Sequence, residues 1–443
     1  MDRLRSIRHA GVFALAFLAA LAVGSSLLEW AAEAQSAPAY RNIPLWPRPF
    51  TDDSWVLGSV TGVATDSQNH VWVLHRGDES LEANERGMIP QPGATGQPSS
   101  SVCCMAAPYV LEYDANGLLV SSWGGRSVGY QWPTVSGGIT VDAKGNVWIA
   151  ATGAEPAAGG RGRGAAAAAP AESDLPTGAG ALPAAAAARG AAAAAGRGAA
   201  AAPTPADAHI LKFARNGRYL LTIGTPGKMD GPDSQATLNR PSAIAIDDST
   251  NEVFVADMGN RRVVVFDADK GTYKRHWFAY GEKTAGAAPG RYDPAEPAAK
   301  SFRDITCIEI ARDGMVYVCD KSSNRIQVFD KSGKFIKEAF IAKNTLGGVL
   351  QGSFGTINAA GAVWDVALSS DAQQRYLFVA DGMNKKVRVL LRDNLSEVGS
   401  IGSGGRYPGQ FLVVNSVAVD SQGNLYTGET HHGKRVQKFV PGK

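Results

Sequence analysis

The chain has 443 residues, of which 44% are hydrophobic and 19% charged, and its formal net charge at pH 7 is +3. So small a net charge gives no support to binding of nucleic acid or of an anionic membrane surface. Without the two unusual segments described next, roughly 350 residues remain, which is enough for one closed β domain.

The N-terminus has the three parts of a secretory signal. Arginines stand at positions 3, 5 and 8, an uncharged apolar stretch covers 12–23, and Ala32-Glu33-Ala34 offers a small-residue cleavage site before Gln35. We therefore predict a signal peptide over 1–34 and a periplasmic or secreted mature chain with no membrane span. An uncleaved anchor is the alternative, because the apolar run to Leu28 is just long enough to cross a bilayer.

A second unusual segment, 153–208, consists almost wholly of Ala, Gly, Pro and Arg. Its Gly and Pro breaks and its lack of an apolar face favour a disordered insert, since it cannot bury enough surface to offset the entropy of ordering. In an exported protein its Arg-Gly steps do not indicate a nucleic-acid partner.

The rest of the chain repeats one pattern six times. Each copy has an alternating apolar run, a turn with Gly or Asn, a second alternating run, a polar turn and a third run. The copies lie at 63–75 (continuing at 109–123), 139–152 (continuing at 210–224), 242–266, 305–329, 366–391 and 417–439. Repeats of this kind stack one supersecondary unit many times, so we predict an all-β, six-bladed β-propeller over 35–443.

The sixth copy has only three strands before the chain ends. The segment 54–58 has the shape of the outer strand that precedes other copies. We therefore predict that an N-terminal strand completes the last blade and closes the ring, which removes its exposed edges.

Cys307 and Cys319 flank a tight turn at 312–314. A three-residue loop with Gly314 in the left-handed conformation would place the two cysteines opposite each other, within reach of a disulfide in an oxidising compartment. Two small buried thiols are the alternative, and the sequence leaves both open.

The repeats resemble the NHL family of six-bladed propellers across the mature chain. Within it, the segment Leu74 to Asp78 (Leu-His-Arg-Gly-Asp) is similar to a His-Arg-Gly-Asp segment of peptidyl-α-hydroxyglycine α-amidating lyase, and Gly428 to His431 is similar to a second segment of that family. The resemblance implies an active-site role for the arginine at position 76.

The same resemblance implies a zinc ion held by three histidines on the innermost strands, a common catalytic arrangement. The matching positions here are Gly137, Thr306 and Asn415, and none is a histidine. We therefore expect the zinc cage to be missing, which argues against lyase activity.

Two groups of residues remain as candidate sites. His75, Arg76 and Asp78 suit an anionic ligand, with the arginine as a fork for carboxylate or phosphate; the alternative is that His75 replaces the Asp of the blade pattern and Arg76 begins a loop. Near the axis, Asp304, Trp364, Asp365 and Asn415 offer oxygens for calcium, as in lactonase-type propellers, and an aromatic face for a ligand. Trp364 could equally plug the channel.

The leading hypothesis is a monomeric, non-enzymatic module that binds a protein or a small molecule at the channel mouth. The alternative is a divergent metal-dependent lyase or hydrolase, with zinc or calcium at the axis and with Arg76 and Asp365 as its catalytic residues. Asp304 and Asn415 would be the further metal ligands.

Overall fold

In this computed structural model the described residues are 36–82, 85, 103–153, 207–346, 348–352, 355–359 and 361–442. The predicted signal segment 1–34 and nearly all of the insert 153–208 lie outside them. The last two residues of that insert belong to the folded part: Asp207 is buried, and its Oδ2 accepts hydrogen bonds from Thr134 and Val135.

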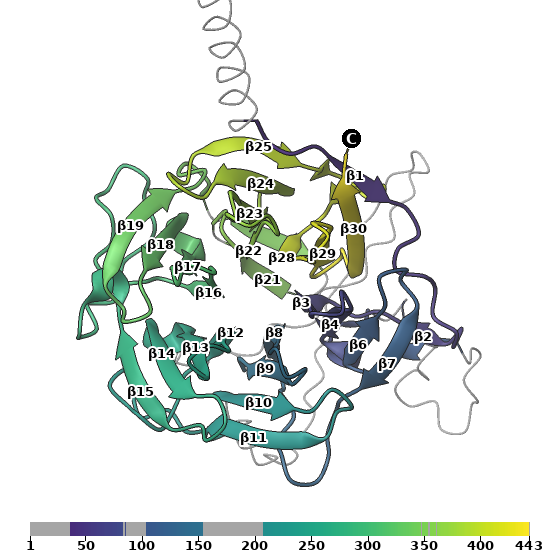
Figure 1. Ribbon diagram of the computed structural model, residues 1–443, viewed down its shortest axis with the longest axis horizontal. Helices are drawn as coiled ribbons and strands as arrows, with labels where there is room; N and C mark the ends of the chain where they lie inside the picture. Colours follow the sequence, from purple (N-terminus) through teal and green to yellow (C-terminus); the bar gives the residue numbers. More distant parts are fainter. Residues whose placement is uncertain are drawn as a thin grey trace, which may run out of the picture. The chain divides into compact units, whose positions relative to one another are not determined.

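Six four-stranded antiparallel sheets form a ring, which confirms the six-bladed propeller (Figure 1). In blades one to three the strands run from the axis outward as β3 (Val60–Thr65), β4 (Val71–His75), β6 (Val110–Tyr113), β7 (Leu119–Trp123); β8 (Ser136–Val141), β9 (Val147–Ala151), β10 (His209–Phe213), β11 (Tyr219–Gly224); β12 (Pro241–Asp247), β13 (Glu252–Asp257), β14 (Arg262–Asp267), β15 (Tyr273–Trp277).

Blades four to six follow the same order. Their strands are β16 (Ile305–Ile310), β17 (Val316–Asp320), β18 (Arg325–Phe329), β19 (Phe335–Phe340); β22 (Asp365–Leu368), β23 (Tyr376–Asp381), β24 (Lys386–Leu391), β25 (Glu397–Ile401); β28 (Val414–Val419), β29 (Leu425–Glu429), β30 (Arg435–Pro441) and β1 (Tyr40–Ile43).

An N-terminal strand closes the ring, as predicted, but it is not the segment 54–58. β1 pairs antiparallel with β30, with Tyr40 opposite Pro441. Trp55 and Val56 instead form β2, which pairs in parallel with β5 (Met105–Ala106), a short strand between β4 and β6. The sequence pattern alone could not show which segment closes the ring, because both are short apolar runs. Only β1 reaches the free edge of β30.

Within the described residues, three short strand pairs and four 3-10 turns lie outside the six blades. The pairs are β2 with β5, β20 (Gly348–Gly352) with β21 (Gly355–Ala359), and β26 (Ser403–Gly404) with β27 (Gln410–Phe411). The turns are η1 (Gly77–Ser80), η3 (Met258–Asn260), η4 (Ala279–Gly281) and η5 (Lys321–Ser323). No helix among the described residues is long and apolar enough to cross a membrane.

The core lies between the blades. Six clusters of buried apolar side chains are present among the described residues, and each joins two neighbouring blades. In the cluster between blades one and six, for example, Val63 and Val73 pack with Ala418 and Tyr426. Burial of apolar surface therefore favours a closed ring over separate blades.

Strand direction gives the ring two unlike faces. Innermost strands begin, and second strands end, on one face, which we call the loop face; it also carries the connections between blades. The tight turns between first and second strands and between third and fourth strands lie on the opposite face, which we call the turn face.

Candidate ligand-binding site at the axial mouth

The residue that follows the second strand holds an equivalent place in several blades. The backbone N–H of Arg76, Thr152, Lys321 and Thr430 donates to the residue just before the innermost strand, with N···O distances of 3.0, 2.9, 3.0 and 3.0 Å. These residues belong to blades one, two, four and six. Because blades one and four face each other across a six-membered ring, Arg76 and Lys321 lie on opposite sides of the loop-face end of the axis. We call this end, with Arg76, Asp304, Lys321, Trp364 and His431, the axial mouth.

Arg76 is a half-buried cation whose guanidinium has no hydrogen bond or ion pair to another described residue. Its Nε is buried. Burial lowers the pKa of the Arg76 guanidinium, and no carboxylate offsets this effect. Charges buried without a partner are unfavourable. An anion bound next to Arg76 would therefore stabilise this uncompensated positive charge.

His431 lies beside Arg76. Burial, followed by the charges of Arg76, His432 and Lys321, lowers the pKa of the His431 imidazole to about 4, so it is neutral at pH 7. Its Nδ1 is buried without a partner among the described residues, while its carbonyl accepts a hydrogen bond from Ser59 Oγ at 3.2 Å. The backbone of His431 has a φ of 54°, in the left-handed region, a strain that is often found at functional sites.

Lys321 is held in place from two sides. Its Nζ lies 2.9 Å from Asp304 Oδ2 and 4.7 Å from the centroid of the Trp364 ring. Lys321 and Arg240 hold the pKa of the Asp304 carboxyl below its usual value, against the effect of burial. A Cβ on Gly361 would lie 1.7 Å from the Lys321 carbonyl oxygen, so only glycine allows the chain before Trp364 to pass this close.

Trp364 is 9% exposed and its Nε1 donates to the Gly361 carbonyl at 2.9 Å. Of the two roles expected for it, the packed position on Lys321 leaves little aromatic face for a ligand. Asp304 is likewise engaged, because it accepts hydrogen bonds from both Lys321 and Ser322.

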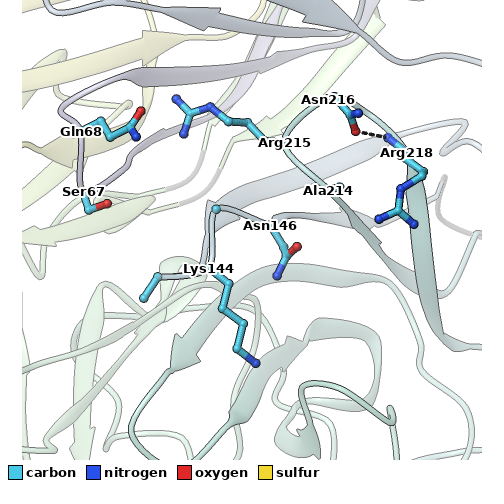
Figure 2. Close-up of a pocket in the computed structure, with 10 residues that line it drawn as sticks. Ser67, Gln68, Lys144, Asn146, Ala214, Arg215, Asn216 and Arg218 are labelled. Atoms are coloured by element: carbon cyan, nitrogen blue, oxygen red, sulfur yellow. Dashed lines mark hydrogen bonds between the residues drawn. The ribbon is translucent and has the colours of Figure 1, made fainter.

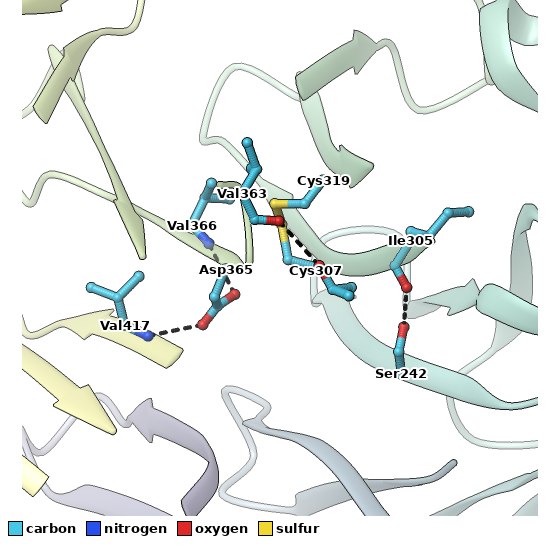
Figure 3. The surroundings of a disulfide bond; sticks show 9 residues. Ser242, Ile305, Cys307, Cys319, Val363, Asp365, Val366 and Val417 are labelled. Carbon is cyan, nitrogen blue, oxygen red and sulfur yellow. Dashed lines mark hydrogen bonds between the residues drawn. A yellow bond between two sulfur atoms is a disulfide. The ribbon is translucent and has the colours of Figure 1, made fainter. Parts of the chain in front are cut away.

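The residues around the axis mainly tie blade to blade. Near the axis, at least one hydrogen bond crosses each of the six interfaces, and we call the following set of six the inter-blade belt. Its links are Thr61 Oγ1 with Ser136 Oγ, Thr152 Oγ1 to Pro241 O, Ser242 Oγ to Ile305 O, Thr306 Oγ1 to Val363 O, Val417 N to Asp365 Oδ2, and Asn415 Nδ2 to Thr61 O. Figure 3 shows the links of Ser242 and Asp365.

Asp365 has a structural role that the sequence alone does not indicate. Its two oxygens accept the N–H groups of Val366 and Val417, each at 2.9 Å. Burial nevertheless raises the pKa of Asp365 to about 7, against these hydrogen bonds. Burial and the charge of Asp365 also raise the pKa of Glu309, on the innermost strand of blade four, to about 8. Sequence reasoning missed Glu309, which is the charged residue of its strand, Ile305–Ile310.

The residues of the first candidate group, His75, Arg76 and Asp78, have different surroundings in the structure. His75 is 0% exposed, its Nδ1 accepts the N–H groups of Gly58 and Gly77, and its Nε2 donates to the Pro108 carbonyl. Both ring nitrogens are therefore used within the chain, which favours the alternative that His75 replaces the Asp of the blade pattern. Asp78 is exposed and accepts a hydrogen bond from the Ala106 N–H at 3.4 Å. Only Arg76 of this group has donors to spare.

The axial residues do not fit a zinc ion. No imidazole stands at Gly137, Thr306 or Asn415, and the oxygens of Asp365 already accept two N–H groups. Asn415 retains one buried acceptor, Oδ1, without a partner among the described residues. Among the described residues, the axis therefore offers fewer free oxygens than the six to eight that a calcium ion takes.

One other cluster, far from the mouth, has the residue types of a metal site. Ligand atoms of Asp66, His70 and Glu112 lie within 4.8 Å of one another on the turn face. The Arg215 guanidinium occupies this place, with Nη1 2.9 Å from Asp66 Oδ2 and Nη2 paired with Glu112. The cluster is therefore an ion-pair network that joins blades one and two.

An open pocket of about 540 Å³ lies beside this network, lined by turns of blades one and two (Figure 2). Its cations are Lys144, Arg215 and Arg218. Figure 2 shows these side chains pointing away from one another, so they do not converge on one ligand group.

Cys307 and Cys319 lie directly opposite each other in β16 and β17, with Cα atoms 5.0 Å apart, and are joined by a disulfide (Figure 3). The turn has the expected form, since Gly314 has a φ of 83° and the Ala311 N–H donates to Met315 O.

The comparisons with known proteins agree with this fold. Residues 238–266, in blade three, match the NHL repeat family. No curated protein sequence matches the chain. The chain is therefore a six-bladed β-propeller that contains an NHL repeat.

Several solved structures share the arrangement at 11% sequence identity. A catalytically inactive virginiamycin B lyase from Staphylococcus aureus with quinupristin has a TM-score of 0.41, with 91% of this chain and 89% of that chain covered. A streptogramin B lyase has a TM-score of 0.43, with 92% and 98% covered. A protein of unknown function from Bacteroides thetaiotaomicron has a TM-score of 0.47, with 92% and 73% covered. Likenesses at this level say nothing about ligand or activity.

Proposed function

We propose that this propeller is an exported binding module that takes an anionic ligand at the axial mouth. The observation that carries the proposal is the half-buried Arg76 guanidinium, whose Nε is buried and which has neither a hydrogen bond nor an ion pair among the described residues. A carboxylate or phosphate group would supply the missing charge and accept two parallel hydrogen bonds from such a fork.

The surroundings of Arg76 support an anion over a cation. The positive charges of Arg76 and Lys321 help to lower the pKa of His431, and its buried Nδ1 has no partner among the described residues. Asp304, the carboxylate at the mouth, is already paired with Lys321. An incoming anion would therefore meet donors that are already in position, which reduces the free-energy cost of ordering on binding.

Export is supported by two features of the chain. The first is the signal-like segment 1–34, and the second is the Cys307–Cys319 disulfide, because such bonds persist in oxidising compartments. Sequencing of the mature N-terminus tests this part of the proposal: we expect Gln35 as the first residue, and a mature chain in the periplasm or the medium. A chain that retains Met1 in the cytoplasm contradicts it.

Binding is tested by calorimetry with inorganic phosphate, sulfate and acetate. We expect Arg76→Gln to weaken binding about ten- to hundredfold, the usual effect of losing a charge-assisted hydrogen bond. Arg218→Gln is the matched control, since it removes the same charge from an exposed site on the turn face. Equal affinity in wild type and Arg76→Gln would refute the proposal.

A divergent metal-dependent enzyme is the second candidate. It is suggested by the neighbouring carboxyls of Asp365 and Glu309, whose pKa values are raised to about 7 and about 8 and which could exchange protons with a substrate near neutral pH; a metal ion would need ligands beyond those described at the axis. Elemental analysis for zinc, calcium and iron separates the two candidates. About one tightly held ion per chain that is lost in Asp365→Ala would favour the enzyme, whereas no bound ion after dialysis against zinc and calcium would favour the binding module.

A further inference from the structure

We propose that Asp66, His70 and Glu112 form a zinc-binding site on the turn face, and that a zinc ion and the Arg215 guanidinium compete for the same place. The ligand atoms of the three residues lie within 4.8 Å of one another. Carboxylate oxygens and an imidazole nitrogen are ordinary ligands of zinc. The site lies on the opposite face from the axial mouth, so the inference does not depend on the anion site proposed there.

Blade one differs from blades two and six at the turn between its first two strands. In those two blades the aspartate that begins the turn accepts a hydrogen bond from the side chain of an asparagine four residues later. The pairs are Asp142 with Asn146 and Asp420 with Asn424, with Nδ2···Oδ2 distances of 2.9 and 2.7 Å. In blade one the residue four positions after Asp66 is His70. Blade one therefore has an imidazole where the other two blades have an amide.

Blade one also differs on its third strand. The residue opposite the aromatic side chain of the second strand is a lysine in blades two and six, and its Nζ lies over that ring. The pairs are Lys212 with Trp148, at 4.7 Å, and Lys438 with Tyr426, at 5.4 Å. In blade one Glu112 is opposite Trp72, and the cation over the Trp72 ring is Arg215, at 5.3 Å. This exchange of charge accounts for the ion pair, but it does not account for the histidine.

The charges of the cluster favour a divalent cation. The side chains of Asp66 and Glu112 are 3% and 4% exposed, and the guanidinium of Arg215 is the cation paired with both among the described residues. Two buried carboxylates facing one guanidinium leave one negative charge uncompensated, which is unfavourable. A zinc ion in the place of the guanidinium would neutralise both carboxylates.

The contacts of His70 point the same way. Its Nδ1 lies 2.6 Å from Glu112 Oε1 and 2.7 Å from Arg215 Nη2. A ring nitrogen either donates or accepts a hydrogen bond, so Nδ1 can satisfy one of these two groups but not both. A metal ion would accept lone pairs from both Nδ1 and Oε1. Tetrahedral zinc holds its oxygen and nitrogen ligands roughly 3.3 Å apart, so a small outward movement of the two side chains would suffice.

The surroundings supply orientation and access. The Oδ1 of Asp66 accepts the N–H groups of Gln68 and His70, each at 2.9 Å, and its Oδ2 accepts Trp72 Nε1 at 3.1 Å. Such outer hydrogen bonds fix the direction of a metal-binding carboxylate. The side chain of Arg215 is 34% exposed and lines the open pocket of about 540 Å³ (Figure 2). The pocket gives the guanidinium room to leave and gives an ion a path of entry.

The test is calorimetric titration of the mature protein with zinc after treatment with EDTA. We expect about one zinc ion per chain at this site, and His70→Asn should weaken its binding about tenfold or more. This variant restores the residue of blades two and six, so the turn should keep its fold. Arg215→Gln should bind zinc more tightly than wild type, because the competing charge is gone. His276→Gln, a half-buried histidine of blade three, is the matched control and should change nothing.

Three results would overturn the inference. The first is equal zinc affinity in wild type and His70→Asn, since the ion would then bind elsewhere. The second is an Arg215→Gln variant that binds zinc no more tightly than wild type, which would rule out the competition. The third is a bound ion that is lost in Asp365→Ala but kept in His70→Asn, because it would lie at the axis. None of these results would affect the anion site at the axial mouth.

Discussion

Replacement of Asp365 by asparagine should change how the stability of the propeller depends on pH. Burial raises the pKa of Asp365 in the folded chain to about 7, whereas an unfolded aspartate titrates near about 4. Between these values the folded state binds more protons than the unfolded state. The free energy of unfolding therefore falls as pH rises through this window.

The magnitude follows from the size of the shift. A gap of roughly three pKa units, at about 1.4 kcal/mol each, amounts to about 4 kcal/mol over the whole window. Roughly 1.4 kcal/mol is lost for each pH unit between about pH 5 and 7. Asparagine cannot ionise, yet its Oδ1 can still accept the Val417 N–H that links blades five and six. The variant should therefore lose about half of the slope, because Glu309, whose pKa burial also raises to about 8, still titrates on folding, and it should become more stable than wild type near pH 8.

Urea denaturation at several pH values from 5 to 8 measures the effect. Asp365→Ala is the companion variant: it should lose the same part of the slope, but at the additional cost of about 1–3 kcal/mol for an unsatisfied N–H at every pH. Asp53→Asn, an exposed carboxyl, is the control. An Asp365→Asn variant that keeps the wild-type slope would show that Asp365 is not the group whose burial governs this dependence.

Three further outcomes are expected from the fold. Reduction of the Cys307–Cys319 disulfide should lower stability by about 2–4 kcal/mol in denaturation with and without dithiothreitol, and an unchanged midpoint would contradict this. Arg262→Leu should cost about 3–5 kcal/mol in the same assay, because it leaves Asp257 buried and unpaired, 2.8 Å from the lost Nε; a loss below about 1 kcal/mol would count against this role. Deletion of residues 36–43 should expose the edge of β30 and produce aggregates in size-exclusion chromatography, and a stable monomer would argue that closure by β1 is dispensable.

The sequence predicts the fold well because every blade carries the same signals. Alternating apolar residues and turn glycines such as Gly314 act locally, so each hairpin can be read without knowledge of its neighbours. The choice of β1 over the segment 54–58 as the closing strand depends on which segment meets β30 in space. Periodicity carries no information about that contact.

The site was predicted only in part. Arg76 stood out through a short motif, but the role of His75 depends on two backbone N–H groups, from Gly58 and Gly77, that the sequence does not bring together. Lys321 and His431 lie in polar turns that resemble any solvated turn. Their importance comes from the ring, which brings blades four and six to the same axis as blade one.

The pairing of β1 with β30 has a consequence for the order of folding. The residues that meet there, Tyr40 and Pro441, are separated in the sequence by almost the whole propeller. Contacts of such large sequence separation form late, because the intervening chain must first be organised. Five blades can collapse as the chain emerges, but the sixth is incomplete until its C-terminus is available. A circular permutant that joins β30 to β1 by a short turn would convert this long-range contact into a local hairpin, and the ring would then close without waiting for its two ends to meet.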